Sequence, residues 1–216
     1  MVVREKFEME LKELNELLIK LGVQSSHALA NAFTALEEQD FEAALEIIED
    51  DVKMNLLEEE INDLAILLIA KQQPVASDLR RIIAAIKIAA DLERMADFAV
   101  NIAKSTIRIG KEPFIKPLTH LKKMHELTIQ MIDLSIQSYE KEDIILAKEV
   151  SEMDDEVDQL YGETIKTLLE RAQENMAQVT QLTFIARYLE RTADHATNIA
   201  ENIFFMVKGR HYDLNE

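Results

Sequence analysis

Apolar residues recur at spacings of three and four along most of the chain. This period places them on one side of an α-helix, where they can form a buried stripe. The pattern is interrupted only at a few places that carry turn-forming or capping residues. It predicts six helices, at about 3–36, 41–71, 77–109, 118–140, 144–173 and 176–209.

The predicted breaks have the local chemistry of helix ends. Side chains that can accept a hydrogen bond from a free backbone N–H precede three of the helices, namely Asp40, Asp143 and Asn175. Gly110 is followed by Pro113 and Pro117, which interrupt helices, so this segment is the expected central linker. The chain has only 4 Gly and 3 Pro, which favours long helices over a sheet architecture.

The two halves of the chain resemble each other. Residues 92–103 align with 189–200, and nine of these twelve positions are identical. Acidic residues upstream match at an offset of 103, whereas the later match has an offset of 97, so the second copy lacks six residues between its middle and last helices. Such a repeat indicates one duplicated structural unit. The expected fold is all-α, with two tandem three-helix bundles at 1–110 and 118–216.

Charge and composition narrow the choice of partner. The chain has 41 Asp and Glu against 24 Lys and Arg, a formal net charge of −17, so it should repel nucleic acid and an acidic membrane face. It has no Cys, which excludes disulfides and thiolate sites. The N-terminus lacks an apolar signal core, and no segment reaches the roughly 18 apolar residues of a membrane span. We therefore expect a cytoplasmic protein that meets membranes only through other proteins.

Each copy carries oxygen-bearing side chains one residue past the apolar stripe of its middle and last helices, about 100° round the helix axis. They are Asp51, Asn55, Glu93, Asp97 and Asn101 in the first copy, and Asp154, Asp158, Glu190, Asp194 and Asn198 in the second. If the middle and last helices of a copy are neighbours, these columns can face one another across a shallow groove.

Two interpretations of the columns remain open. Acidic residues beside an apolar stripe are usually solvated, and Arg94 and Arg191 stand three residues before Asp97 and Asp194, where an intrahelical ion pair contributes about 0.2–0.5 kcal/mol. However, like charges four residues apart repel each other, and both last helices repeat them. A cation between the helices would compensate the repulsion, and the oxygen ligands favour iron, manganese, magnesium, calcium or carboxylate-bound zinc.

The chain resembles the PhoU family, regulators associated with bacterial phosphate uptake. The resemblance rests on the duplicated Leu-Glu-Arg-x-x-Asp element at 92–97 and 189–194, on the Asn-Ile-Ala that follows each copy, and on Gln-Gln-Pro-Val-Ala-Ser-Asp-Leu-Arg at 72–80. It covers nearly the whole chain. It implies two three-helix bundles side by side and a non-enzymatic role.

The resemblance also implies a site, partners and an oligomeric state. Multinuclear iron or zinc sites would be held by Glu/Asp-x-x-x-Asp motifs, which here are Glu93 with Asp97, Asp154 with Asp158, and Glu190 with Asp194. The fourth motif departs from the pattern, because Asn55 follows Asp51 where the family has Asp. The implied protein is a homodimeric negative regulator of the phosphate-starvation response, coupling the phosphate ABC transporter to a sensor histidine kinase.

Two other functions compete with this one. A carboxylate-bridged di-metal enzyme would use Glu-x-x-His pairs, but none of the five histidines has an acid three residues before it. Alternatively, the protein is a structural helical interaction protein whose acidic residues only keep it soluble. No nucleophile motif and no glycine-rich phosphate loop is present.

Overall fold

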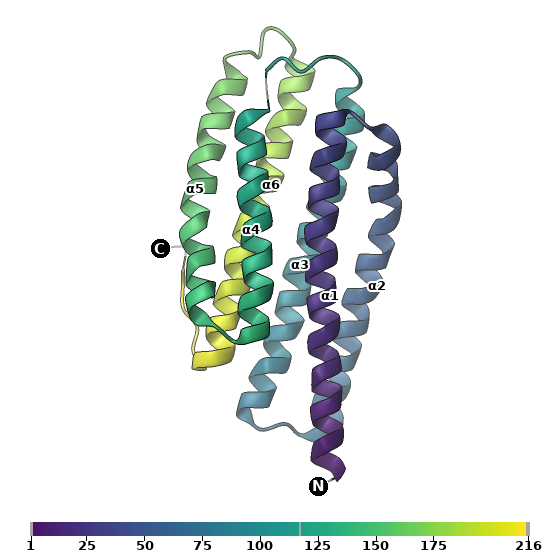
Figure 1. Cartoon of the computed structure of the whole chain (residues 1–216), viewed down its shortest axis with the longest axis vertical. Helices are drawn as coiled ribbons and strands as arrows, with labels where there is room; N and C mark the ends of the chain where they lie inside the picture. Colours follow the sequence, from purple (N-terminus) through teal and green to yellow (C-terminus); the bar gives the residue numbers. More distant parts are fainter. Residues whose placement is uncertain (1, 117, 215–216) are drawn as a thin grey trace.

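The computed structural model describes residues 2–116 and 118–214, which form six helices joined by short connections (Figure 1). The helices are α1 (Val2–Glu38), α2 (Phe41–Gln72), α3 (Ala76–Ile109), α4 (Thr119–Lys141), α5 (Ile144–Leu169) and α6 (Met176–Lys208). The predicted all-α fold with six helices is confirmed. The linker residue Pro117 and the outermost residues of the two expected repeats, 1 and 215–216, lie outside the described residues.

The three predicted N-caps are confirmed. Asp40 accepts hydrogen bonds from the backbone N–H groups of Glu42 and Ala43, at 3.0 and 3.1 Å. Asp143 accepts one from Ile145 at 2.8 Å. The Asn175 side chain accepts one from the N–H of Gln178 at 3.0 Å. Each cap therefore satisfies backbone donors that have no partner inside the helix.

The expected end of the fifth helix near 173 is wrong, because α5 ends at Leu169. Beyond it the backbone hydrogen bonds span three residues instead of four, from Arg171 N to Leu168 O and from Ala172 N to Leu169 O. This tighter winding turns the chain toward the cap of α6. Compared with the first repeat, α5 is six residues shorter than α2, and the connection after it is longer, at residues 170–175 against 73–75.

The second repeat is inverted with respect to the first. In Figure 1, α1 and α3 run upward and α2 downward, whereas α4 and α6 run downward and α5 upward. The repeats meet through α3 against α6 and α1 against α4, while α2 and α5 lie at opposite edges of the molecule. Within each repeat the middle helix packs on the last one, as the sequence interpretation requires.

The two repeats share one hydrophobic core. A single cluster of buried side chains includes residues from all six helices. Helices α3 and α6 contribute many alanines to it, among them Ala85, Ala89, Ala99, Ala193 and Ala196. Small side chains allow two helices to approach closely, so the crossing of α3 and α6 forms a dense centre. None of the helices in the described part of the chain has a segment long and apolar enough to cross a bilayer.

We predict that Gly22→Val destabilises the protein by about 1–3 kcal/mol, because a side chain there would press on α4. A Cβ at this position would lie 2.7 Å from Cγ1 of Ile136. Urea unfolding monitored by circular dichroism measures the change. The double variant Gly22→Val/Ile136→Ala should cost less than the sum of its single variants.

A matched control is available on α5. A Cβ added at Gly162 meets nothing within 4 Å. Gly162→Ala should therefore raise stability, by about 0.5–1 kcal/mol, through the lower conformational entropy of the unfolded chain. If Gly22→Val proved as stable as the wild type, the close contact between α1 and α4 would be wrong.

Candidate functional site

In the second repeat, carboxylates of α5 and α6 lie in the same partly buried region. Asp154 on α5 and Glu190 on α6 are each only 8% exposed. Asp194 is half-buried, and Asp158 is exposed at the edge of the group. Both buried acids flank the apolar stripes that hold α5 against α6, so the packing that forms the core also removes these carboxylates from water.

The electrostatics of this group disfavour ionisation. Burial, with the neighbouring charges of Asp158 and Asp194, raises the pKa of Asp154 to about 6. Burial and the charge of Asp194 raise the pKa of Glu190 to about 7, against the opposing effect of Arg187. The pKa of Asp158 is raised by the same two causes, burial first and then Asp194. The four acids therefore repel one another as negative charges.

Two oxygens of this group are buried without a hydrogen-bond partner, Oδ1 of Asp154 and Oε2 of Glu190. The other carboxylate oxygen of Glu190 is paired with Arg187, one turn earlier on α6. The hydroxyl of Thr197 offsets a small part of the raised pKa of Asp154, although its geometry falls outside that of a hydrogen bond. Buried acceptors without donors are costly, and hard cations such as Mg²⁺, Mn²⁺ and iron bind such oxygens.

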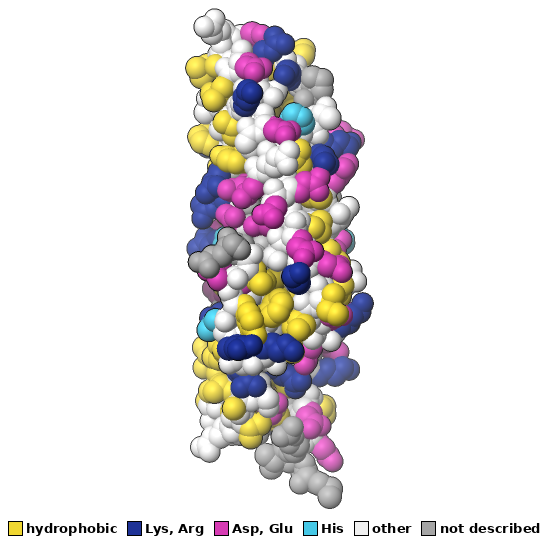
Figure 2. Space-filling model, turned by 90° about the vertical axis from the view of Figure 1, so that its left-hand side faces the viewer, with side chains coloured by type: hydrophobic (Ala, Val, Ile, Leu, Met, Phe, Trp, Pro, Cys, Tyr) yellow, Lys and Arg dark blue, Asp and Glu magenta, His cyan; other side chains and the backbone are white. Residues whose placement is uncertain are grey.

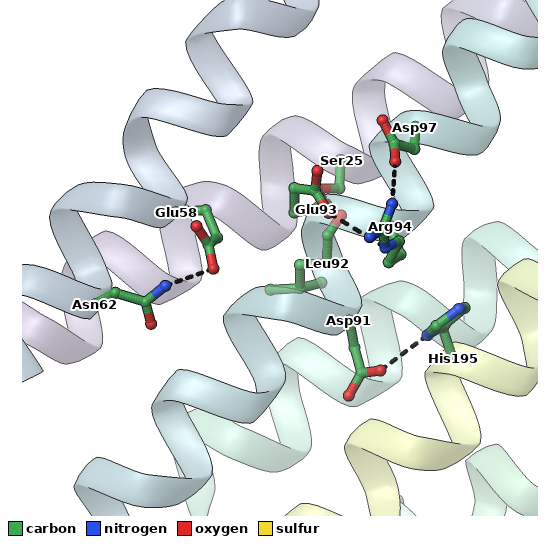
Figure 3. A network of polar contacts seen from close by, with 9 residues as sticks. All are labelled: Ser25, Glu58, Asn62, Asp91, Leu92, Glu93, Arg94, Asp97 and His195. Carbon is green, nitrogen blue, oxygen red and sulfur yellow. Dashed lines mark hydrogen bonds and ion pairs between the residues drawn. The ribbon is translucent and has the colours of Figure 1, made fainter.

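The first repeat has a similar group on α2 and α3, with an internal cation. Arg94 Nη1 lies 2.7 Å from Asp97 Oδ2, and Arg94 Nε lies 3.8 Å from Glu93 Oε2 (Figure 3). Burial and the charge of Asp97 raise the pKa of Glu93. The same causes raise the pKa of Asp51, while Asn55 and Lys104 lower it. The exposed Asn55 thus lies beside Asp51, and its amide oxygen is an uncharged potential ligand.

Sequence reasoning missed Glu58 and Asn62 in the first repeat. Asn62 donates a hydrogen bond to Glu58 at 2.5 Å, and the charge of Glu58 helps to raise the pKa of Glu93. Figure 3 shows this pair on α2, across from Glu93 on α3. The spacing of Asp51, Glu58 and Asn62 follows one helix face, which was a usable signal. It was hidden because the corresponding residues of the second copy are Tyr161 and Ile165.

The two repeats use different arginines, which corrects one expectation. The predicted pair of Arg94 with Asp97 is confirmed, but Arg191 does not pair with Asp194. Its guanidinium lies 5.5 Å from the ring centre of Phe98 on α3, where the ring face attracts it. Arg187, which the sequence interpretation did not consider, forms the ion pair with this carboxylate group, through Glu190. Its counterpart in the first copy is Ala90, so the duplication did not mark it.

The contact between the repeats also differs at its two symmetric positions. On one side, Nδ1 of His195 lies 2.8 Å from Oδ1 of Asp91 (Figure 3). The offset of 97 relates these residues to Phe98 and Tyr188, whose rings stack at 6.0 Å on the other side. An ionisable pair and an aromatic pair therefore occupy equivalent places, and His195 is engaged in packing between α3 and α6.

The carboxylates of each repeat lie near one another, but they are not arranged as the ligands of a single cation. No group of three or more Asp, Glu or His side chains within residues 2–116 and 118–214 is arranged to hold a cation. Asn101 and Asn198 are half-buried, and neither side chain is hydrogen-bonded to a carboxylate of its column. Figure 2, which shows the α5 side of the molecule, has a concentration of acidic side chains at mid-height and a band of basic side chains below it.

The similarity to known proteins extends over both repeats. The family model of the PhoU domain matches residues 18–106 and again 121–203. A Clostridium acetobutylicum protein named phosphate-specific transport system accessory protein PhoU homolog is 36% identical over 219 residues, covering 100% of both chains. An Aquifex aeolicus homolog of the same name is 40% identical over 84% of each chain.

Solved structures show the same relationship. The crystal structure of PhoU from Pseudomonas aeruginosa aligns with a TM-score of 0.90 at 29% identity, covering 94% of this chain and 100% of that one. A structure described as the phosphate transport system regulatory protein PhoU from Streptococcus pneumoniae also aligns with a TM-score of 0.90, at 28% identity, covering 96% and 99%.

We predict that the stability difference between Glu190→Gln and the wild type depends on pH when metal is absent. The pKa of this carboxyl rises from 4.5 to about 7 on folding. Its stabilising contribution is therefore present below the unfolded pKa and is lost as the pH rises through about 7, whereas glutamine stays neutral. The variant should gain on the order of 1 kcal/mol relative to the wild type between about pH 5 and about pH 8.

Urea unfolding in EDTA at several pH values measures this difference. The control is Glu60→Gln, which replaces an exposed acid of α2 and should show no comparable trend. A stability difference for Glu190→Gln that stayed constant with pH would contradict the desolvated state of this carboxyl.

Proposed function

Because the chain belongs to the PhoU family, we propose that it is a regulator of phosphate uptake that represses the phosphate-starvation response. In this proposal it is a cytoplasmic adaptor that couples the phosphate ABC transporter to a sensor histidine kinase. The observation that carries it is the match to the family at both repeats, together with a relative named as a phosphate transport accessory protein that covers the whole chain.

Metal binding at the carboxylate groups is the second part of the proposal. Asp154, Asp158, Glu190 and Asp194 would hold iron or zinc in the second repeat, with manganese and magnesium as weaker candidates. A bound cation would supply the positive charge that these acids lack. The buried oxygens without partners and the raised pKa values of Asp154 and Glu190 support this assignment.

Arginines would compete with a bound cation for the carboxylates of each repeat. Arg187 on Glu190, and Arg94 between Glu93 and Asp97, neutralise part of the negative charge in each repeat. Both guanidinium groups belong to exposed side chains, so they can move away at little cost. A cation would therefore compete with an arginine for the same carboxylate, and the metal-free and metal-bound proteins would differ mainly in the position of these side chains.

The first repeat should bind metal less tightly than the second. Asn55 replaces an acid there, and a neutral carboxamide attracts a cation less strongly than a carboxylate. Arg94 also contacts two acids, whereas Arg187 is paired with one. Asn101 and Asn198 remain proposed ligands as well.

The di-metal enzyme is a weaker alternative. Such sites take histidine ligands, yet His195 is paired with Asp91 and His125 stacks on Phe33 at 4.4 Å. Burial lowers the pKa of His125 to about 4. Oxygen consumption by the iron-loaded protein tests this alternative. The homodimer implied by the resemblance stays a prediction, which light scattering of the purified protein tests.

We predict that Arg187→Gln raises the affinity of the second repeat for divalent iron or zinc by about tenfold, because it removes the competing cation. The double variant Glu190→Gln/Asp194→Asn should lose the metal of this repeat. Titration calorimetry measures the affinity, and elemental analysis of freshly purified protein measures the content.

The first repeat supplies the matched control, since Glu93→Gln/Asp97→Asn removes the equivalent acids. This variant should lower the metal content less than the second-repeat variant does. Equal metal content in the wild type and Glu190→Gln/Asp194→Asn, or none in either protein, would refute the metal-binding part of the proposal.

We also predict binding to the nucleotide-binding subunit of the phosphate transporter and to the cytoplasmic part of the sensor kinase. Biolayer interferometry with purified partners at high and low phosphate measures both interactions. The variant Glu190→Gln/Asp194→Asn should bind each partner at least about tenfold more weakly if metal organises the docking surface. If the wild-type protein bound neither partner at high phosphate, the adaptor role would be wrong.

A further inference from the structure

A groove of about 510 Å³ opens on the first repeat between the second half of α1 and the first half of α2. Its lining comes from residues within 24–38 of α1, from the cap Asp40 and residues within 43–54 of α2, and from Ala96 and Val100 of α3. Both α3 residues are buried beneath the surface, so they form its floor. The groove touches the first carboxylate group only at Asp51 and otherwise lies outside it.

The second repeat provides a reference for this region because the two hairpins have the same turn. Gln39 and Glu142 both have positive φ, 52° and 51°. In each repeat the following aspartate donates its backbone N–H to a carbonyl five residues earlier, Asp40 to Ala35 at 2.9 Å and Asp143 to Ser138 at 3.0 Å. The offset of 103 therefore relates equivalent positions in both helices of the hairpin.

At five lining positions the second repeat has a larger apolar side chain. The pairs, first repeat before second, are Gln24 and Leu127, Ala28 and Met131, Asn31 and Leu134, Ala43 and Leu146, and Asp50 and Met153. Met131 is fully buried and the other four apolar residues are partly buried. The hairpin of the second repeat is thus bulkier and more apolar at these five positions, whereas the first repeat has smaller or polar side chains there, along its groove.

The charge around the groove is complementary to a cationic ligand. Its rim carries the exposed acids Glu38 and Glu46, which have no ion-pair partner among the described residues. The lining residue Lys53 is paired with Asp50 at 2.6 Å. The groove therefore has small and apolar residues at its floor and an excess of negative charge at its rim.

We propose that this groove docks an amphipathic helix of a partner protein that carries an apolar stripe flanked by Lys and Arg. Its apolar side chains would fill the space that Met131, Leu134 and Leu146 fill in the second repeat, and its basic residues would face Glu38 and Glu46. The lining segment of α1 is about 21 Å long, which matches about four helical turns. This inference goes beyond the proposed function, because it holds whether or not the carboxylate groups bind metal.

The test uses a synthetic fifteen-residue peptide, about the length of the groove, with leucines at helical spacing and lysines on both flanks. Fluorescence anisotropy of the labelled peptide measures binding in EDTA at about physiological ionic strength. The variant Ala28→Met/Asn31→Leu, which introduces the second-repeat side chains, should weaken binding at least about tenfold by filling the groove. Ala43→Leu is a second, smaller filling change on the opposite wall.

Controls separate docking from general attraction between opposite charges. Glu38→Gln/Glu46→Gln at the rim should weaken binding severalfold, whereas Glu59→Gln/Glu60→Gln, which removes two exposed charges farther along α2, should change it less than about twofold. A scrambled peptide of equal charge, without the stripe, should bind at least about tenfold more weakly than the designed peptide. Circular dichroism checks that each variant is folded.

Cross-links from a photoreactive peptide, mapped by mass spectrometry, should fall within residues 24–54. Three outcomes would overturn the proposal: equal affinity of the filled variants and the wild type, equal affinity of the scrambled and designed peptides, or cross-links elsewhere on the protein. Because the assay contains neither metal nor transporter, its failure would leave the proposed adaptor function untouched, and loss of metal binding would leave this result untouched.

Discussion

The antiparallel packing of α3 against α6 is the interaction on which the rest of the structure depends. Alanines on both helices allow their backbones to approach closely, and the shared core forms around this crossing. The duplicated Leu-Glu-Arg-x-x-Asp element lies on these two helices. Its leucines, Leu92 and Leu189, are buried in the core, and the glutamate that follows each one is carried to the edge of the buried region. The packing that buries these leucines therefore also removes the neighbouring carboxylates from water.

Duplication has produced two related halves with different surfaces. The carboxylate groups are compensated by different arginines, since Phe98 attracts Arg191 in one repeat while the equivalent position in the other is His195. The interface between the repeats likewise has an ionisable pair on one side and an aromatic stack on the other. The groove along α1 and α2 adds a third difference. The two halves therefore present different sites on one scaffold. The second repeat has the more deeply buried carboxylates, and the first repeat has the groove.

Most of the fold could be predicted from local signals in the chain. Periodic apolar residues and the caps Asp40, Asp143 and Asn175 located the helices, because both act within a few residues of the backbone they organise. The end of α5 was misplaced, since Arg171 and its neighbours are compatible with helix and only the route to α6 winds them into a tight turn. The inversion of the second repeat was not anticipated, because an apolar stripe does not specify which partner covers it.

The carboxylate columns were identifiable because their spacing is repeated in both copies. By itself the sequence determined the helices, the duplication and which acids flank the apolar stripes, all of which follow from helical periodicity and residue type. Only the tertiary structure decided which acids are desolvated together, that Glu58 and Arg187 join them, that Arg191 contacts Phe98 instead, and that a groove opens along the first hairpin. These properties depend on side chains from different helices meeting in space, and such distances are set by packing rather than by position along the chain.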